Sequence, residues 1–165
     1  MVSFVTIVDA MTDAARLPSR PLSLDDFIPF RLSFTSNLVS DTIARSYEAL
    51  FGLTIPEWRL VAVIAETGGV TQAEIGQRTR MDKVTVSRAA IALVERGVLE
   101  RRANPLDRRS HLLVLGDAGE SLYAAIAPKA RDLEARIFAQ FDPAEVAAFT
   151  AMLRRIDAVT LALRD

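Results

Sequence analysis
The fold of this chain is decided between residues 71 and 115, a stretch that opens with Thr71-Gln72-Ala73-Glu74-Ile75-Gly76-Gln77-Arg78 and continues with Asp82-Lys83-Val84-Thr85-Val86-Ser87-Arg88. Both segments begin like helices, because Thr71 with Glu74 has capping-box spacing and Asp82 is a favourable N-cap. The second helix is expected to end at Arg96, with Gly97 beyond it. Only Thr79 to Met81 separate the two, which is the short connection of a helix-turn-helix.

The hydrophobic period changes after Gly97. Residues 98–102 and 111–115 read as strands that flank the turn Asn104-Pro105-Leu106-Asp107-Arg108-Arg109-Ser110, and residues 69–70 are expected to add a brief third strand. A helix suited to a DNA major groove is thus followed by an arginine-tipped β-ribbon able to reach the neighbouring minor groove. The pattern predicts a winged helix-turn-helix with DNA as its partner.

The rest of the chain reads as helical. A helix is expected over 25–51, with Pro29 in its first turn and Gly52 as a left-handed cap. Another is expected from the Thr54/Glu57 capping box to about Glu66, and two more start at the acid-x-x-Glu spacings Asp117/Glu120 and Asp142/Glu145. The predicted fold is mainly α with a small β-wing (α+β). Its expected parts are an N-terminal extension (1–22), mobile or packed on a partner; helix 1 on the dimerisation and effector side (23–52); the DNA-binding domain (53–116); and C-terminal dimerisation helices (117–165).

Composition excludes several classes of protein. The chain has no cysteine, so disulfides, thiolate metal sites and thiol redox sensing are ruled out. Its apolar stretches fall short of the roughly 20 residues that a membrane span needs. The apolar run Val2–Val8 has no basic residues before it and is followed by Asp9, a poor fit to a secretory signal. We therefore expect a cytoplasmic protein without a membrane partner.

Charge is distributed unevenly along the chain. Residues 71–115 hold nine basic and five acidic side chains, whereas the remainder holds eleven basic and sixteen acidic ones. The net charge of −1 therefore hides a basic module on an acidic body, which is what local phosphate binding requires.

The terminal helices carry more apolar surface than a small winged domain can cover. Burial in a two-fold homodimer removes that surface from water. An intramolecular helical core is the alternative.

These elements, in this order, resemble the MarR family of bacterial transcriptional regulators, and the resemblance covers about residues 25–163. It is carried by Leu53-Thr54-Ile55-Pro56-Glu57-Trp58-Arg59, the two helix-turn-helix segments, Glu95-Arg96-Gly97-Val98-Leu99 and the wing residues Asp107-Arg108-Arg109-Ser110. The chain departs from the family pattern at Gly116, where the family usually has Thr, and in the extension 1–22. Neither departure touches the DNA-reading face.

The expected DNA contacts follow from side-chain chemistry. Arg88 suits two hydrogen bonds to guanine, Thr85 and Ser87 suit bases or phosphates, and Lys83 suits a phosphate. Gln72 lies at a helix N-terminus that offers N–H groups to a further phosphate. The resemblance adds Arg109 in the minor groove, with Asp107 bracing its guanidinium.

Plainer alternatives stand beside these roles. Arg101 and Arg102 are equally well explained as solvated strand charges. For Arg88 a structural surface role is the alternative to base contact. Asp107 is also suited to capping its own turn.

The resemblance further implies an effector site, since small, often aromatic anions bind in this family between the dimer helices and the DNA-binding lobe. The candidate lining residues are Phe30, Arg31, Phe34, Asn37, Trp58 and Arg59. Binding there would change the separation of the two recognition helices, which must be near one DNA turn, about 34 Å. The alternative places Trp58 and the phenylalanines in the core.

An enzyme is not expected. The single histidine, His111, lies beside the wing, there is no Gly-rich phosphate loop, and no His/acid cluster has metal-ligand spacing. No cofactor, metal or catalytic residue is therefore predicted. The sequence favours a homodimeric DNA-binding regulator, and the resemblance implies that it represses at a pseudo-palindromic site near its own promoter and is released by a small molecule. The alternative is a winged-helix protein-interaction module that has lost DNA binding.

Overall fold
The structure, a computed structural model, describes residues 22–163. Its helices are α2 (Ile28–Phe51), α3 (Ile55–Thr67), α4 (Gln72–Thr79), α5 (Lys83–Glu95), α6 (Asp117–Phe138) and α7 (Pro143–Ala162), and its strands are β1 (Leu99–Ala103) and β2 (His111–Leu115). The chain divides into two units after Val39, within α2. The N-terminal extension predicted over 1–22 lies outside the described residues, apart from Leu22.

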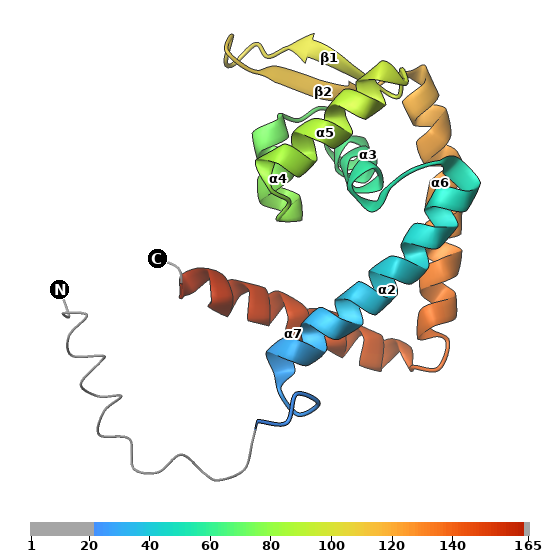
Figure 1. The fold of residues 1–165 in the computed structure, drawn as a ribbon, viewed down its shortest axis with the longest axis vertical. Helices are drawn as coiled ribbons and strands as arrows, with labels where there is room; N and C mark the ends of the chain where they lie inside the picture. The colour runs from blue at the N-terminus through green and yellow to red at the C-terminus, as the bar shows by residue number, and fades with distance from the viewer. Residues whose placement is uncertain (1–21, 164–165) are drawn as a thin grey trace, which may run out of the picture. The chain divides into compact units, whose positions relative to one another are not determined.

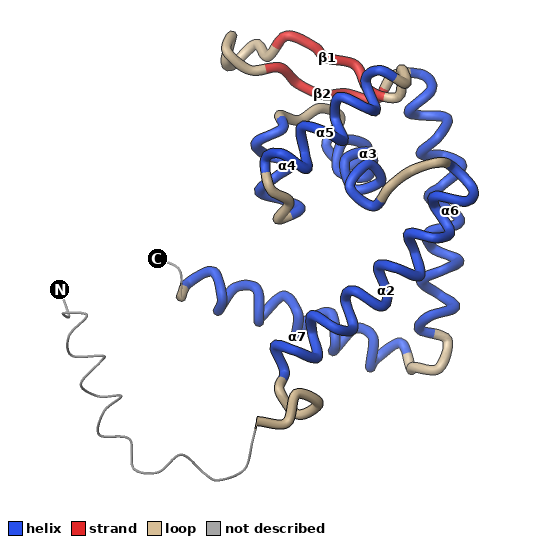
Figure 2. The backbone as a smooth tube through the Cα atoms, viewed as in Figure 1, coloured by secondary structure: helices blue, strands red, loops and turns tan. Residues whose placement is uncertain are grey.

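The predicted mixture of helices and a small hairpin is confirmed. Figure 1 shows α3, α4 and α5 gathered beside the two strands, and Figure 2 shows β1 and β2 as a single hairpin with its connecting loop at the free end. Three of the four helix starts predicted from this spacing are capping boxes in the structure, at Thr54/Glu57, Thr71/Glu74 and Asp142/Glu145.

Two helix starts differ from prediction. α2 begins at Ile28 because a turn, closed by a hydrogen bond from Phe27 N to Leu24 O of 3.2 Å, precedes it. α6 is not capped by Asp117: Gly116 is its N-cap and makes no side-chain hydrogen bond. A Cβ on Gly116 would lie 3.2 Å from Gly97 O, so a side-chain cap has little room there.

The hairpin is antiparallel, with Leu99 opposite Leu115 and Ala103 opposite His111. The third strand predicted at 69–70 reduces to a single bridge between Val70 and Leu113. Its two backbone hydrogen bonds, of 3.1 and 2.8 Å, tie the middle of β2 to the segment that follows α3.

The core lies in the winged domain. α3 packs against α4, α5, β2 and α6, and the largest fully buried side chains are Leu53, Leu60, Ile64, Ile75, Leu93, Leu99, Leu113 and Ile126. α5 buries Val86, Ala89, Ala90 and Leu93. These positions fall on one face of α5, so its other face is left for a partner.

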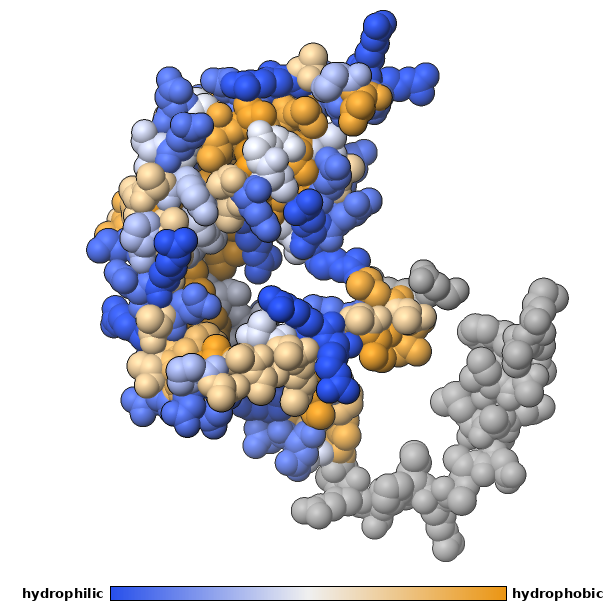
Figure 3. Space-filling model, turned by 180° about the vertical axis from the view of Figure 1, so that it is seen from behind, coloured by the Kyte–Doolittle hydropathy of each residue, from blue (hydrophilic) through white to orange (hydrophobic). Residues whose placement is uncertain are grey.

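α7 is different, because none of its residues is buried within the single chain. Phe149, Met152 and Val159 are exposed by 44%, 57% and 61%. Figure 3 shows apolar surface gathered at the C-terminal end of α7. Apolar surface of this extent on one helix indicates an interface.

Candidate nucleic-acid interface
α4 begins at a fixed point in the chain. The Glu74 carboxylate accepts hydrogen bonds from Thr71 N and Thr71 Oγ1 at 2.9 and 2.8 Å, and Thr71 Oγ1 accepts from Glu74 N at 3.3 Å. The bonds from Thr71, with help from the charge of Arg78, lower the pKa of Glu74. Gln72 follows as the first helical residue, half-exposed at the surface.

The turn between α4 and α5 is tight. Arg80 adopts a left-handed conformation with φ of 58°, the only non-glycine residue with positive φ among residues 22–163. Thr79 Oγ1 donates to Ile75 O at 2.7 Å and accepts from Met81 N at 3.4 Å. A Cβ on Gly76 would lie 3.3 Å from Met81 O, so the turn packs closely on α4 and fixes how the two helices cross.

Asp82 caps α5. Its Oδ1 accepts from Val84 N and Thr85 N, both at 2.9 Å, and its Oδ2 accepts from the Thr85 hydroxyl at 2.6 Å. The Thr85 side-chain hydrogen bond is the main cause that lowers the pKa of Asp82. The Thr85 hydroxyl proton is thereby committed to Asp82, so Thr85 is left as an acceptor for a base amino group rather than a donor to a phosphate.

The uncovered face of α5 carries most of the predicted contacts. Lys83 and Arg88 are exposed, and Ser87 is half-exposed. Sequence reasoning missed Val84, whose side chain is 57% exposed. Val84 precedes Arg88 by four residues, so the two are neighbours on the surface of the helix.

The wing loop is held by its own polar groups. Asn104 Nδ2 donates to Ser110 Oγ at 2.8 Å, and Asn104 Oδ1 accepts from Leu106 N at 3.0 Å. Asp107 Oδ1 accepts from Arg109 N at 3.0 Å. No ion pair between Asp107 and the Arg109 guanidinium occurs in residues 22–163, so the predicted bracing is absent and Asp107 caps its turn, as in the alternative reading.

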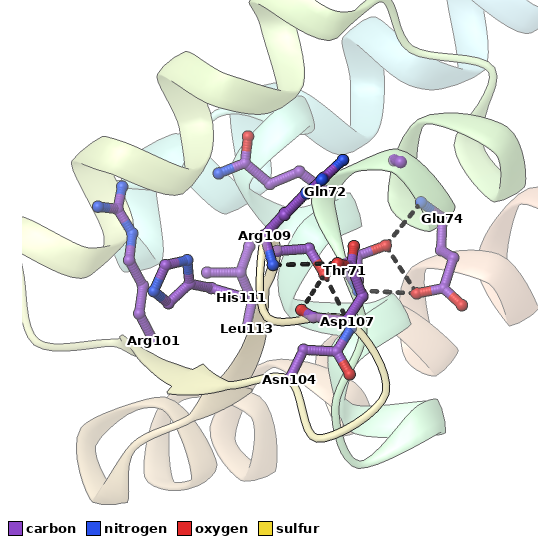
Figure 4. Close-up of a pocket in the computed structure, with 11 residues that line it drawn as sticks. Thr71, Gln72, Glu74, Arg101, Asn104, Asp107, Arg109, His111 and Leu113 are labelled. Carbon is purple, nitrogen blue, oxygen red and sulfur yellow. Dashed lines mark hydrogen bonds between the residues drawn. The ribbon is translucent and has the colours of Figure 1, made fainter.

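An open cleft of about 570 Å³ lies between α4 and the wing. We call it the wing cleft; Figure 4 shows the side chains around it. It brings together three of the predicted residues, Gln72, Asp107 and Arg109, with two outside the predicted set, Arg101 and His111. The remaining lining residues are Thr71, Ala73, Glu74, Asn104, Ser110 and Leu113.

A further feature that the sequence did not reveal is a clasp at the far end of α5. Arg96 Nη1 donates to Gly52 O at 3.0 Å and lies 3.7 Å from Glu57 Oε1. Glu57 is buried, and its other oxygen accepts from Thr54 N at 2.8 Å. The clasp ties the end of α5 to the start of α3.

The six predicted effector residues divide between the two units. In residues 22–39, the Phe30 and Phe34 rings stack at 6.1 Å, and the Arg31 guanidinium lies 5.4 Å from the centroid of Phe34. Arg31 also pairs with Asp25 at 2.9 Å. Asn37 is exposed on the same helix.

The other two candidates lie on α3. The ring of Trp58 lies 5.1 Å from that of Tyr47 and 6.1 Å from that of Tyr123. Trp58 therefore packs against the core, as the alternative reading had it. Arg59 is exposed.

Within residues 22–163, no group of three or more His, Asp or Glu side chains is arranged to hold a metal ion. No helix in that range has both the length and the apolar character needed to cross a membrane.

Comparison with known proteins matches residues 51–110 to the model of the MarR family. The HTH-type transcriptional regulator YwoH of Bacillus subtilis is 31% identical over 104 residues, which are 63% of this chain and 75% of that protein. The chain belongs to the MarR family. Its members are transcriptional regulators, so the winged helix-turn-helix predicted from the sequence is confirmed.

Two solved MarR-type structures share the fold. A MarR variant from Escherichia coli, complexed with operator DNA, superposes with a TM-score of 0.72 at 22% identity, over 83% of this chain and 99% of that one. Bordetella bronchiseptica BpsR, whose DNA binding is regulated by 6-hydroxynicotinic acid, gives a TM-score of 0.75 at 21% identity, over 84% and 98%.

Proposed function
We propose that this MarR-family protein is a cytoplasmic homodimer that represses transcription by binding a pseudo-palindromic DNA site. The observation that carries the proposal is the free face of α5, where Lys83, Ser87 and Arg88 lie beside an arginine-tipped wing. Four buried residues fix the opposite face of α5 to the core. The exposed face then enters the major groove, and Arg109 reaches the adjacent minor groove.

The reading of bases is assigned to three side chains of α5. Arg88 donates two hydrogen bonds to a guanine, and Thr85 accepts from a base amino group, since its proton is held by Asp82. Val84 presents exposed methyl groups, which suit the methyl group of a thymine. Lys83 and Gln72 position the protein on phosphates.

The dimer rests on α7 and the apolar surface around it. None of the residues of α7 is buried in the single chain, and its exposed side chains include Phe149, Met152 and Val159. A second copy that covers this surface also supplies the second recognition helix, which a two-fold DNA site requires.

Release by a small aromatic anion is the proposed regulation. Phe30, Phe34 and Arg31 form a cluster of two rings and a cation on α2, and an aromatic carboxylate bound there would replace Asp25 as the partner of Arg31. The control of BpsR by 6-hydroxynicotinic acid supports the same class of ligand. The test adds a panel of aromatic carboxylates to the protein–DNA complex and measures the release of DNA. Arg31→Ala is expected to lose this ligand-induced release, whereas Arg45→Ala, on the same helix, is expected to keep it.

The central test is fluorescence anisotropy with DNA from upstream of the gene, beside random DNA, at two salt concentrations. We expect tighter binding to the upstream DNA, with log affinity falling by about 0.9 per phosphate contact for each tenfold rise in salt. The competing function is a winged-helix protein-interaction module. If the folded dimer bound neither DNA, that alternative would replace the proposed function.

A further inference from the structure
The wing cleft carries more positive charge than the predicted contacts account for. Besides Arg109 it is lined by Arg101 from β1 and His111 from β2. Figure 4 shows the imidazole of His111 next to Arg101, with Arg109 and Gln72 on the side of α4. These groups come from separate parts of the domain and face one space.

The strand register explains why Arg101 and His111 share this face. Arg101 is opposite Leu113, and His111 is two residues from Leu113 on the same strand. Side chains opposite each other, or two apart, point to the same side of a sheet. Leu113 is buried against the helices, so Arg101 and His111 point to the helix side, whereas Arg102 points to the other.

The acidic groups of the cleft have partners already. The Glu74 carboxylate on α4 is bonded to Thr71, and Asp107 in the loop accepts from Arg109 N. Within residues 22–163, neither Arg101 nor Arg109 forms an ion pair, while Arg102 pairs with Glu100 at 3.3 Å. Hydrogen bonds leave the carboxylates of Glu74 and Asp107 charged, so the lining holds two guanidinium groups and two carboxylates, and it becomes net positive when His111 is protonated.

The position of the cleft identifies its ligand. With α5 in the major groove and the wing tip in the adjacent minor groove, the sugar-phosphate backbone that separates the grooves must pass between them. The wing cleft lies between the first turn of α4 and the wing. We propose that it binds a phosphodiester of this backbone through Arg101 and His111, so that DNA binding strengthens as the pH falls from 8 to 6.

The pH dependence follows from imidazole chemistry. A neutral imidazole donates one hydrogen bond, whereas the protonated ring donates two and carries a positive charge, and histidine changes between these forms near neutral pH. A phosphate favours the protonated form, so binding takes up protons. Each protomer takes up at most about one proton on binding DNA. The DNA affinity therefore rises by at most about tenfold per His111 for each unit by which the pH falls.

The inference rests on the proposed DNA-binding function and is tested with the full chain and DNA from upstream of its gene. Anisotropy titrations from pH 6 to 8 at constant ionic strength compare the wild type with His111→Gln, which keeps a donor but gains no charge. We expect the wild-type affinity to rise at least tenfold over this range and that of His111→Gln to stay nearly level. Circular dichroism at each pH confirms that both proteins remain folded.

A second arm compares two neighbouring arginines on opposite faces of β1. Arg101→Ala is expected to reduce the salt slope of log affinity by about 0.9 per protomer, the value of one lost phosphate contact. Arg102→Ala removes the same charge from the other face and is expected to leave the slope unchanged.

The outcomes separate the two proposals. If the folded wild type bound no DNA, the proposed function itself would fail. If it bound DNA but His111→Gln kept the wild-type pH dependence, or both arginine variants changed the slope equally, the wing cleft would not be a phosphate site.

Discussion
Replacing Gly119 by alanine is expected to destabilise the protein, although alanine is the better helix former. Gly119 lies in the first turn of α6 and is buried. A Cβ built there would fall well inside the contact distance of the Val98 carbonyl oxygen, and would also lie 3.2 Å from the Leu115 side chain. The first obstacle is backbone, so it cannot turn aside as a flexible side chain does.

The magnitude follows from two opposing effects. Gly→Ala in a helix gains up to about 1 kcal/mol from propensity. Making room for the methyl group moves α6 away from the start of β1 by about 1 Å, and overpacking of a rigid site costs about 1–3 kcal/mol. The clash is with backbone and lies in the core, so we place the cost at the upper end and expect a net loss of about 1–2 kcal/mol.

Urea unfolding, followed by circular dichroism at one fixed protein concentration, measures the change. The concentration must be fixed because the stability of the proposed dimer would depend on it. Ser121→Ala is the matched control: Ser121 is exposed on the same helix two residues on, and its replacement is expected to be neutral or slightly stabilising. A Gly119→Ala protein more stable than the wild type would refute the close approach of α6 to Val98.

Four further predictions concern the DNA-reading elements and their caps. Arg109→Ala should weaken binding to all DNA sites while size-exclusion chromatography still shows a dimer; unchanged affinity would remove Arg109 from the interface. Arg88→Ala should lower the ratio of specific to non-specific binding by about 1–3 kcal/mol in paired titrations, and an equal loss on random DNA would reassign it to phosphate. Replacing the thymines of the DNA site one at a time by deoxyuridine should weaken DNA binding by the wild type at one position of each half-site, and should not change binding by Val84→Ala at that position. Equal losses of affinity in both proteins would exclude Val84 as the residue that contacts the thymine methyl group. Because the pKa of Glu74 is lowered, its bonds to Thr71 stabilise the fold at pH values above the ordinary carboxyl pKa of 4.5, and this stability is lost as the pH falls below that value. Glu74→Gln should therefore lose less stability than the wild type when the pH is lowered below 4.5. Identical acid-unfolding profiles would contradict a stabilising role for these bonds.

The helix boundaries could be predicted because they are set by local chemistry. Each of the three confirmed capping boxes lies within four consecutive residues, and Gly52, Gly68 and Gly97 all adopt the positive φ that ends a helix. Asp117 does not cap α6, although Asp117 and Glu120 have the same residue types and spacing as Asp142 and Glu145. There the N-cap is Gly116, whose N–H donates to Val98 O at 3.1 Å, which is a tertiary contact.

The site was predicted less completely because its geometry depends on tertiary contacts. Exposure of Val84 depends on which face of α5 the core covers, and the position of His111 in the cleft depends on the register with β1. The hydrogen bond from Arg96 to Gly52 spans 44 residues of sequence. The left-handed Arg80 also had no signal, since glycine or asparagine is the usual choice there. Alternation along β2 was the one signal that would have paired His111 with the helix side of the sheet.

These contacts also limit how an effector can act in the proposed repressor. α5 is held along its length by four buried residues and at its end by Arg96. Sliding or rotating α5 within its domain would break both attachments, including the contact of Arg96 with the buried Glu57. A ligand that changes the separation of the two recognition helices therefore has to move each winged domain as a body, through the helices that join it to the dimer interface. Substitutions that loosen the Arg96 clasp should consequently weaken DNA binding with and without ligand, and leave the ratio of the two affinities unchanged.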